Sequence, residues 1–545
     1  MPGRNEPERH RSIFGPVQAR SESKLSPMIA GAHPQPVEAL SHRVDRLRAD
    51  LTGFTVDAVD ELLGPVAHAA LGREHALPAR LVVQNLPDDP LATLVAVFVL
   101  GLTVPGQRLA AALPSLGLTG AEQLGLLSRA GPGQDDDVRA RVDLRPYRSI
   151  DGLGTADWWM ISDPGELATG RPLAADHVLG VGGASLTLAR STIRNPVDRV
   201  LDLGTGCGIQ ALHAARHART VIGTDTSARA LRMTELNWLL NGPTITGAEL
   251  STRQGSLLEP VADERFDLVV SNPPFVITPR STTTAYEYRD GGLVGDELVR
   301  TLITGMSAVL RPGGIAQLLG NWEQRAGESW HERVGDWLSE SGLDGWVVQR
   351  ELQDPAEYAE TWIRDAGQHL SDDAEELYAA WLADFASRGV LGVGFGLVTL
   401  RRPLEAATGV PRLRRLEERR SGPGLPTGAE VAATLAAHDW VANRDDPALL
   451  AAALRVAGDV TEERHHLPGA DDPTVILLRQ GGGAGRVVQA SSALAGLVGA
   501  CSGELTVGQL AGALAVLLEV SESELTAELL PAVRGLITDG LLLPD

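Results

Sequence analysis

A short loop at residues 272–275, with the sequence Asn-Pro-Pro-Phe, follows an apolar run and places an amide where a strand should end. The valines at 269–270 predict the last part of a buried strand, because β-branched runs bounded by turn residues are typical of such strands. Pro273 and Pro274 end it and stiffen the loop, since proline donates no backbone hydrogen bond and has a fixed φ. We therefore expect a rigid loop that presents Asn272 Oδ1 and the Pro273 carbonyl as hydrogen-bond acceptors.

A glycine-rich stretch, Asp-Leu-Gly-Thr-Gly-Cys-Gly at residues 202–208, follows a second predicted strand and opens a predicted helix. Its glycines let a ligand approach backbone N–H groups at the amino end of that helix. Asp225 ends the next predicted strand, about 20 residues on, where a carboxylate can accept the hydroxyl hydrogens of a ribose. Ile209 replaces the third glycine of the dinucleotide-binding pattern, which disfavours NAD. Cys207 is interpreted as a small space-filling residue, and a plain glycine turn is the structural alternative.

The glycine stretch, Asp225, the segment 253–260 and the Asn-Pro-Pro-Phe loop together resemble the class I S-adenosylmethionine-dependent methyltransferases. The branch in question methylates exocyclic or amide nitrogens and includes the release-factor glutamine methyltransferases and the adenine-N6 and guanine-N2 methyltransferases. The resemblance covers about residues 176–325 and implies S-adenosyl-L-methionine as cofactor. It places the methionine part on the glycine stretch, the ribose on Asp225 and the adenine beside Ser256 and Leu257, although relatives often carry an acidic residue where Ser256 stands. The implied cofactor-binding residues are Asp202, Gly204, Thr205, Gly206, Cys207, Gly208, Asp225, Ser256, Leu257 and Asn272.

The 272–275 loop suits methyl transfer to a planar nitrogen. A planar –NH₂ attacks a methyl group poorly unless both hydrogens are held, and Asn272 Oδ1 and the Pro273 carbonyl can accept them. Pro274 helps to fix their separation, and Phe275 is expected to cover the face of the planar group. Because the sulfonium is already an activated methyl donor, positioning can suffice without a strong base. A bare turn is the alternative for Asn-Pro-Pro taken alone.

Two further segments are candidates for the same site. Residues 176–189, which precede the first strand of the glycine motif, are expected either over the cofactor or as a helix-capping loop. Residues 288–298 resemble the glycine-rich segment of the glutamine methyltransferases. They are expected either as a lid on the substrate side or as a plain helix amino terminus.

Two pairs of side chains give weaker signals. His465 and His466 adjoin but lack further ligands at metal spacing, so a solvated strand pair is favoured over a zinc site, and no metal is expected. Trp158 and Trp159 can stack on a planar substrate, yet bulky apolar residues of this kind more often belong to a core.

The composition excludes several classes of protein. A chain of 545 residues with 43% apolar residues indicates a globular protein of several domains. The net charge of −22 disfavours a protein that coats nucleic acid nonspecifically, although a local basic face could still serve one site. Two cysteines exclude a disulfide framework. The apolar stretch 91–104 is too short for a membrane span and is expected to form a core helix. The amino terminus lacks a secretion signal, so we expect a cytoplasmic protein that inserts in no membrane.

Periodicity divides the chain into segments. Strands alternate with helices between about 151 and 402, which indicates βαβ units, whereas the flanking regions show mostly helical spacing. A hairpin-like pair near the carboxyl end suggests a winged-helix-like arrangement there. The expected organisation is a flexible tail (1–34), a helical N-terminal domain (35–150), a methyltransferase domain (151–402), an Arg-rich linker (403–424) and a helical, winged-helix-like C-terminal domain (425–545).

We therefore expect an α/β protein with a doubly wound, mostly parallel, seven-stranded Rossmann-like sheet between two smaller domains. The expected activity is N-methylation of a nucleic acid base, in RNA or DNA, or of a glutamine in a protein such as a translation release factor. Arg412, Arg414 and Arg415 are the first candidates for phosphate contacts, against the alternative that they only solvate a linker. A different class remains open, in which the chain is a non-catalytic regulator that binds S-adenosylmethionine and contacts nucleic acid through its flanking domains. Sequence gives no oligomeric state.

Overall fold

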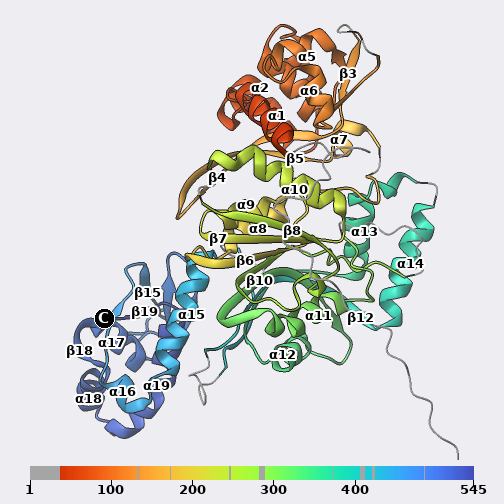
Figure 1. Cartoon of the computed structure of the whole chain (residues 1–545). Coiled ribbons are helices and arrows are strands. Elements are labelled where there is room, and N and C mark those ends of the chain that lie inside the picture. Colours follow the sequence, from red (N-terminus) through yellow and green to blue (C-terminus); the bar gives the residue numbers. More distant parts are fainter. Residues whose placement is uncertain are drawn as a thin grey trace, which may run out of the picture.

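The computed structural model describes most of the chain from residue 37 to residue 545. The segment expected as a flexible tail, 1–34, lies outside the described residues. A sheet flanked by helices forms the middle of the molecule, with the N-terminal helices at one end and the C-terminal helices at the other (Figure 1). The gaps in the described residues are 132, 134–135, 172, 245–246, 281–288, 372, 405–411, 420–423 and 484.

An eight-stranded sheet forms the centre, in the spatial order β13-β11-β12-β10-β9-β6-β7-β8. Strand β6 runs parallel to both of its neighbours, β7 and β9, whereas β12 is antiparallel to both of its own. The strand order reverses between β6 and β9, and ligands of open α/β sheets bind beyond the carboxyl ends at such a point. The strands are β6 Val197–Leu203, β7 Ala218–Asp225, β8 Glu249–Gln254, β9 Phe266–Ser271, β10 Leu310–Arg325, β11 Asp344–Gln353, β12 Val390–Arg401 and β13 Arg414–Glu418.

Helices cover both faces of this sheet, as expected for a Rossmann-like α/β fold. Alternate residues of each strand point to opposite faces, so Val200 and Leu268 pack under α9 and α10, whereas Leu201 and Val269 pack under α11 and α12. The helices of this region are α7 Glu166–Thr169, α8 Gly183–Ser191, α9 Ile209–Ala215, α10 Ala228–Asn241, α11 Glu297–Gly305, α12 Trp330–Ser341, α13 Pro355–Asp365 and α14 Ala374–Ser387, with short 3₁₀ turns η2 Gly242–Thr244, η3 Glu259–Val261, η4 Met306–Ala308 and η5 Gln368–Leu370.

The N-terminal region packs directly on helix α10. Its buried apolar residues join those beneath α9 and α10 in one continuous core, and Arg48 on α1 donates hydrogen bonds to the Leu239 and Leu240 carbonyls at 2.6 and 2.9 Å. Besides helices, the region contains a small sheet of order β1-β3-β2. Its elements are α1 Val37–Asp50, α2 Val56–Leu71, α3 Leu77–Gln84, α4 Pro90–Leu94, the π-helical turn η1 Val95–Val99, β1 Val104–Pro105, α5 Gly106–Ala112, α6 Gly117–Gln123, β2 Leu127–Arg129 and β3 Asp137–Ala140.

The apolar stretch 91–104 lies largely in this N-terminal core. It forms α4 and the π-helical turn η1, and residues 92–100 are buried. The prediction of a core segment is confirmed. Among the described residues, no helix combines the length and the apolar character that a bilayer crossing requires.

An antiparallel hairpin joins the N-terminal region to the central sheet. It consists of β4 Asp143–Asp151 and β5 Gly154–Ser162 and so spans the expected boundary between residues 150 and 151. Two amides of α10 satisfy the outer edge of β5: Asn237 and Asn241 each bond both the N–H and the C=O of one residue of that strand, at 2.8 to 3.0 Å. The Asn237 amide also donates to the Cys207 carbonyl at 2.8 Å, which ties the hairpin to the glycine stretch.

Over its described residues, the C-terminal region combines five helices with two three-stranded sheets, of order β18-β14-β19 and β15-β16-β17. The hairpin expected from the sequence corresponds to β16 and β17, and β15 extends it, while a winged-helix arrangement stays a prediction. The elements are α15 Gly428–Ala442, α16 Asp446–Leu450, β14 Ala453–Val456, β15 Val460–His465, β16 Val475–Gln480, β17 Val487–Ala490, α17 Ser492–Ala500, β18 Ser502–Thr506, α18 Val507–Leu518, α19 Glu522–Thr538 and β19 Leu542–Pro544.

The Arg-rich segment expected as a linker contributes the eighth strand, β13, which pairs in parallel with β11. The expectation of seven strands was therefore wrong, because a segment read as a polar linker lies at the edge of the sheet. Arg414 donates to the Leu338 and Leu343 carbonyls, and the Arg415 side chain, only 16% exposed, pairs with Glu417 and Asp539. These two arginines are thus engaged within the protein, which contradicts their assignment as phosphate contacts. Arg412 is exposed.

Glu417 on β13 is the centre of an ion-pair cluster that holds the C-terminal region on the sheet. Arg415, Arg419 and Arg486 surround its carboxylate, and Arg486 and Asp539 come from the C-terminal region. Burial alone raises the pKa of Glu417, but the three guanidinium groups outweigh burial and lower the pKa to about 2. Loss of this carboxylate would leave its arginines unpaired. Such a loss is destabilising, because the charges in the cluster are partly desolvated.

We expect Glu417→Gln to destabilise the protein at pH 7 by about 3 kcal/mol, the free energy that corresponds to the lowered pKa. The contribution of a carboxylate with a lowered pKa is present above its unfolded value, near 4.5, and is lost as pH falls toward 2. Thermal unfolding of both proteins between pH 7 and pH 2.5 should show the full difference above about pH 4.5 and its progressive loss as pH falls toward 2. Glu463→Gln is the matched control, because Glu463 pairs with Arg479 on the surface of the same region.

Candidate active site

A cavity of about 270 Å³ opens at the carboxyl ends of β6, β7, β8 and β9, at the point where the strand order reverses. It brings together the glycine stretch, Asp225, Ser256, Leu257 and the 272–275 loop, which lie on separate strand ends. The other predicted segments reach it as well. The residues that line it include Asp176, His177, Val178, Leu179, Gly180, Ser185, Gly204, Thr205, Gly206, Cys207, Thr226, Ser227, Gly255, Asn272, Pro273, Pro274, Asp290, Gly291, Leu298 and Leu302.

The glycine stretch turns sharply between β6 and α9. Gly204, Gly206 and Gly208 all have positive φ, a region that favours glycine. At Gly208 a Cβ would also lie 2.9 Å from the Thr234 methyl group, so a larger residue cannot be placed without a shift. Gly204 and Gly206 line the cavity, and a Cβ on either would meet no protein atom within 4 Å. The stretch therefore presents bare backbone to the cavity, as a ligand that binds N–H groups requires.

Asp202 supports this turn from behind rather than lining the cavity. Its Oδ2 accepts hydrogen bonds from Thr205 Oγ1 at 2.7 Å and from the Ala211 N–H at 2.9 Å. Burial raises the pKa of Asp202 to about 7. Asp202 is thus a residue that holds the loop, not a direct ligand contact as expected. Burial also raises the pKa of the Cys207 thiol to about 12, in keeping with a space-filling role.

Asp225 ends β7 on the cavity wall. Its Oδ2 accepts from the Gly206 N–H at 3.0 Å and its Oδ1 from the Ser227 N–H at 2.9 Å, so the carboxylate links the glycine stretch to the start of α10. An ionised carboxylate has about four lone-pair sites, so it can accept hydrogen bonds from hydroxyl groups as well as from backbone N–H groups. Thr226 and Ser227, which also line the cavity, were missed by sequence reasoning, although their position directly after a strand-ending aspartate could have indicated them.

Ser256 and Leu257 follow β8 and line the cavity beside Asp225. Leu257 adopts a φ of 49°, which is uncommon for a residue with a branched side chain. Backbone held in this region concentrates at ligand sites. Their contact with the adenine, which the resemblance implies, stays a prediction.

The 272–275 loop begins directly after β9, as the sequence predicted, and Asn272, Pro273 and Pro274 line the cavity. Asn272 Oδ1 is buried and makes no hydrogen bond with any described residue, an arrangement that costs free energy unless a ligand satisfies the acceptor. The Pro273 carbonyl accepts the Phe275 N–H at 2.8 Å and keeps a second lone pair.

Phe275 packs away from the expected position. Its ring meets Phe395 edge-on, with centroids 6.5 Å apart, and its backbone forms a bridge with Asp290.

Residues 176–189 do reach the cavity, where Asp176, His177 and Ser185 line it. Burial lowers the pKa of His177 despite the nearby Asp163, which keeps the imidazole neutral at pH 7.

The segment 288–298 lies on the other side of the cavity, except for residue 288, which is outside the described residues. Gly291 packs so closely on the 272–275 loop that a Cβ there would lie 3.2 Å from the Pro274 carbonyl oxygen and 2.9 Å from Leu298. Asp290 and Gly291 line the cavity, and Leu298 and Leu302 of α11 complete that wall. The segment is therefore part of the site and not only a helix amino terminus.

The tryptophan pair and the histidine pair lie elsewhere. Trp158 and Trp159 bond Thr244 and the Phe54 carbonyl through their indole N–H groups at 3.0 and 2.7 Å, so they belong to the core under α10, not to a stacking platform. His465 lies 3.6 Å from Glu463 on the surface. Within the described part of the chain, no three His, Cys, Asp or Glu side chains group in a way that could hold a metal ion.

Comparison with known proteins matches residues 181–337 to the methyltransferase small domain. A ribosomal protein uL3 glutamine methyltransferase of Bradyrhizobium diazoefficiens is 31% identical over 33% of this chain and 59% of its own length. A release factor glutamine methyltransferase of Xylella fastidiosa is 38% identical over 24% of this chain and 48% of its own. A ribosomal RNA small subunit methyltransferase C of Alcanivorax borkumensis is 31% identical over 32% of this chain and 48% of its own length. The chain thus spans less than two thirds of each relative.

The flanking regions match two other families, each described as a domain of unknown function: DUF7059 at residues 51–141 and DUF7782 at residues 432–544. The middle of the chain carries the glycine stretch, the strand-ending Asp225 and the Asn-Pro-Pro-Phe loop on one cavity, within the matched range. The middle of the chain, residues 181–337, therefore contains a methyltransferase small domain, similar to that of the glutamine and ribosomal RNA methyltransferases named above.

Proposed function

We propose that this protein transfers a methyl group from S-adenosyl-L-methionine to a planar amide or amino nitrogen. The observation that carries the proposal is Asn272 Oδ1, a buried acceptor without a partner among the described residues, on a proline-stiffened loop at the cavity. The glycine stretch and Asp225 hold the cofactor, which supplies an activated methyl group. A regulator that only binds the cofactor gives the unpaired Asn272 acceptor no role.

The residues of the chain act on the nucleophile by position. Asn272 Oδ1 and the second lone pair of the Pro273 carbonyl accept the two hydrogens of the –NH₂ group, so that its lone pair points toward the methyl group. The amide rotates little once both hydrogens are held, and the prolines fix the acceptors in advance. The proton leaves after the nitrogen becomes cationic, when it is acidic enough to pass to water.

We favour a glutamine side chain presented by a protein over a base in RNA or DNA. The two segments that line the cavity carry exposed apolar side chains, Leu179 and Leu186 in 176–189 and Leu293 and Val294 in 288–298. Three arginines that belong to or contact these segments are paired: Arg229 with Asp163 and Asp176, Arg280 with Asp290, and Arg289 with Asp365. Arg190, directly after the first segment, is exposed. Phosphate recognition requires available cations, and an apolar rim suits a polypeptide.

The test is methyl transfer from labelled S-adenosylmethionine to protein, RNA and DNA fractions of cells that lack the gene. We expect label in protein, on glutamine, with a rate that changes less than about threefold between 50 and 200 mM salt. Transfer to RNA or DNA would instead fall steeply over that range. Each phosphate that the protein neutralises adds about −0.7 to −0.9 to the slope of log affinity against log salt concentration. Label in nucleic acid would overturn the glutamine assignment and leave the N-methylation proposal standing, whereas label in none of the fractions would contradict both.

A further inference from the structure

Helices α13 and α14 form a hairpin between β11 and β12 that packs against the continuation of the 272–275 loop. Val276 and Ile277, directly after the loop, are buried in one apolar cluster with Tyr358, Trp381 and Phe385 of the two helices. The helices therefore supply the packing that surrounds this part of the site, at the side of the molecule where α13 and α14 lie (Figure 1).

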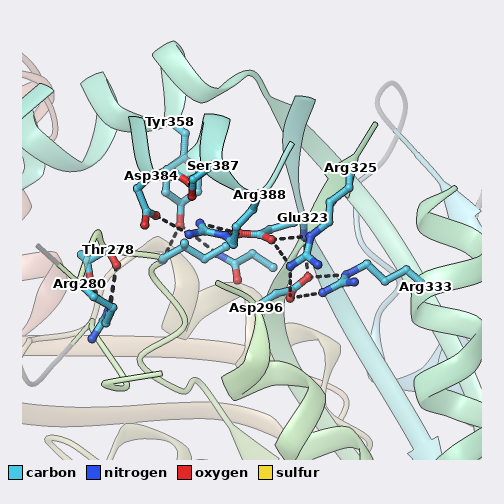
Figure 2. Close-up of polar contacts among 12 residues, drawn as sticks. Thr278, Arg280, Asp296, Glu323, Arg325, Arg333, Tyr358, Asp384, Ser387 and Arg388 are labelled. Carbon is cyan, nitrogen blue, oxygen red and sulfur yellow. Dashed lines mark hydrogen bonds and ion pairs between the residues drawn. The ribbon is translucent and has the colours of Figure 1, made fainter. Parts of the chain in front are cut away.

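Tyr358 on α13 is the polar centre of that packing. Its hydroxyl oxygen accepts hydrogen bonds from the Ile277 N–H and from Asn321 Nδ2 on β10, each at 2.9 Å, and the side chain is fully buried. Figure 2 shows the Tyr358 hydroxyl pointing from the helix toward the segment that carries Thr278. Burial raises the pKa of this phenol, so it remains neutral. One side chain thus joins the helical hairpin, the central sheet and the chain five residues beyond Asn272.

A second connection runs through aromatic rings. The Tyr358 ring stacks on Phe395 of β12 with centroids 5.5 Å apart and an interplanar angle of 21°. Phe395 in turn meets Phe275, the last residue of the loop, edge-on at 6.5 Å. Tyr358 consequently restrains the loop through its hydroxyl and through its ring, by contacts that do not depend on each other.

The same hairpin anchors the segment on the substrate side of the cavity. Arg289 donates from Nη1 to the Trp362 carbonyl of α13 at 2.8 Å, and its own carbonyl accepts the Val276 N–H at 2.8 Å. Arg388, after α14, donates from Nε to Glu323 of β10 at 2.9 Å, beside the Asp296 carboxylate that precedes α11 (Figure 2). The 272–275 loop and the segment 288–298 are therefore both held by contacts with α13 and α14.

We propose that Tyr358 is a positioning residue for methyl transfer, which holds the 272–275 loop so that Asn272 and Pro273 meet the nucleophile in the reactive geometry. This inference rests on the proposed role of that loop. Tyr358 does not line the cavity, so it acts through the loop and not on substrate or cofactor. Small displacements of positioned groups cost large factors in rate, and a loop that has lost one fixed hydrogen bond samples such displacements.

The test compares Tyr358→Phe with Tyr378→Phe in the full chain. Both remove one hydroxyl from the helical hairpin, but Tyr378 bonds only the exposed Glu360, at 3.3 Å, so it serves as the matched control. Hydrogen exchange measured by mass spectrometry should show the amides of residues 275–278 exchanging at least about tenfold faster in Tyr358→Phe and unchanged in Tyr378→Phe. This readout needs no substrate, so unchanged exchange would overturn the inference even if the proposed function fails.

Kinetics then distinguish positioning from mere stability. With the substrate found above, Tyr358→Phe should lower kcat about tenfold while KM and the Kd for S-adenosylmethionine stay within about twofold. Phe395→Leu, which removes the ring connection and keeps the Ile277 hydrogen bond, should give a smaller loss of kcat. Faster exchange with an unchanged kcat would contradict a positioning role. A wild-type protein that methylates no nitrogen would refute the proposed function, and this inference with it.

Discussion

Asn272→Ala should reduce methyl transfer roughly 100-fold or more and leave the affinity for S-adenosylmethionine within a few fold. The substitution removes the acceptor that holds one hydrogen of the nucleophile in the transition state, and loss of a single such partner costs about 3 kcal/mol. The cofactor contacts on the glycine stretch and Asp225 remain. Single-turnover rates with labelled cofactor, together with calorimetric binding, measure the two quantities separately.

Asn443→Ala is the control for this change. Asn443 is exposed at the end of α15 and bonds only the Asp439 carbonyl of its own helix, so its loss should alter neither rate nor binding. If Asn272→Ala retains its turnover, the role assigned to the loop is wrong. If rate and binding are lost together and the unfolding temperature falls, the loss reflects a disturbed fold and not the role of the acceptor.

The second large effect is expected for Asp225→Ala, which should weaken the binding of S-adenosylmethionine at least about tenfold. In the proposed function the carboxylate accepts charge-assisted hydrogen bonds from the ribose hydroxyls, and such bonds are about twice as strong as neutral ones. The substitution also frees the Gly206 and Ser227 N–H groups, which adds mobility to the glycine stretch. Calorimetric titration with the cofactor gives the change directly.

Asp267→Ala is a matched control, because Asp267 also accepts two backbone N–H groups, from Asp198 and Arg199 at 3.2 and 2.8 Å. It lies at the amino end of β9, at the opposite edge of the sheet from the cavity. Both variants thus leave two backbone N–H donors without their carboxylate acceptor, but only Asp225→Ala should lose affinity for the cofactor. Equal affinities in the two variants would show that Asp225 has a structural role alone.

Local patterns in the sequence predicted the parts of the site that lie at strand ends. The glycine stretch, Asp225 and Asn272 each follow an apolar run that could only be a strand, and parallel strands bring their carboxyl ends to one edge. Asp202 was predicted as a ligand contact because it adjoins the glycines. Side chains alternate along a strand, and Asp202 faces the amino end of α9 instead.

Features that depend on distant partners could not be predicted. Arg414 and Arg415 look like linker residues, since the strand they belong to has a polar composition and is recognised only through its pairing with β11. Tyr358 is more than 80 residues from Asn272 in the sequence, and no periodic pattern marks a tyrosine that bonds a backbone N–H across the fold. Nothing in the sequence around Trp158 indicates that helix α10 covers its side chain.

The most direct test of the central claim is the identity of the atom that receives the methyl group. The purified protein, ¹³C-methyl S-adenosylmethionine and protein or RNA from cells lacking the gene should yield a product whose labelled methyl carbon is bonded to an amide or exocyclic amino nitrogen, as determined by NMR and fragmentation mass spectrometry. The same experiment with Asn272→Ala should yield almost none of that product. A methyl group on carbon, oxygen or sulfur, or equal labelling by Asn272→Ala, would contradict transfer to a planar nitrogen held by the 272–275 loop.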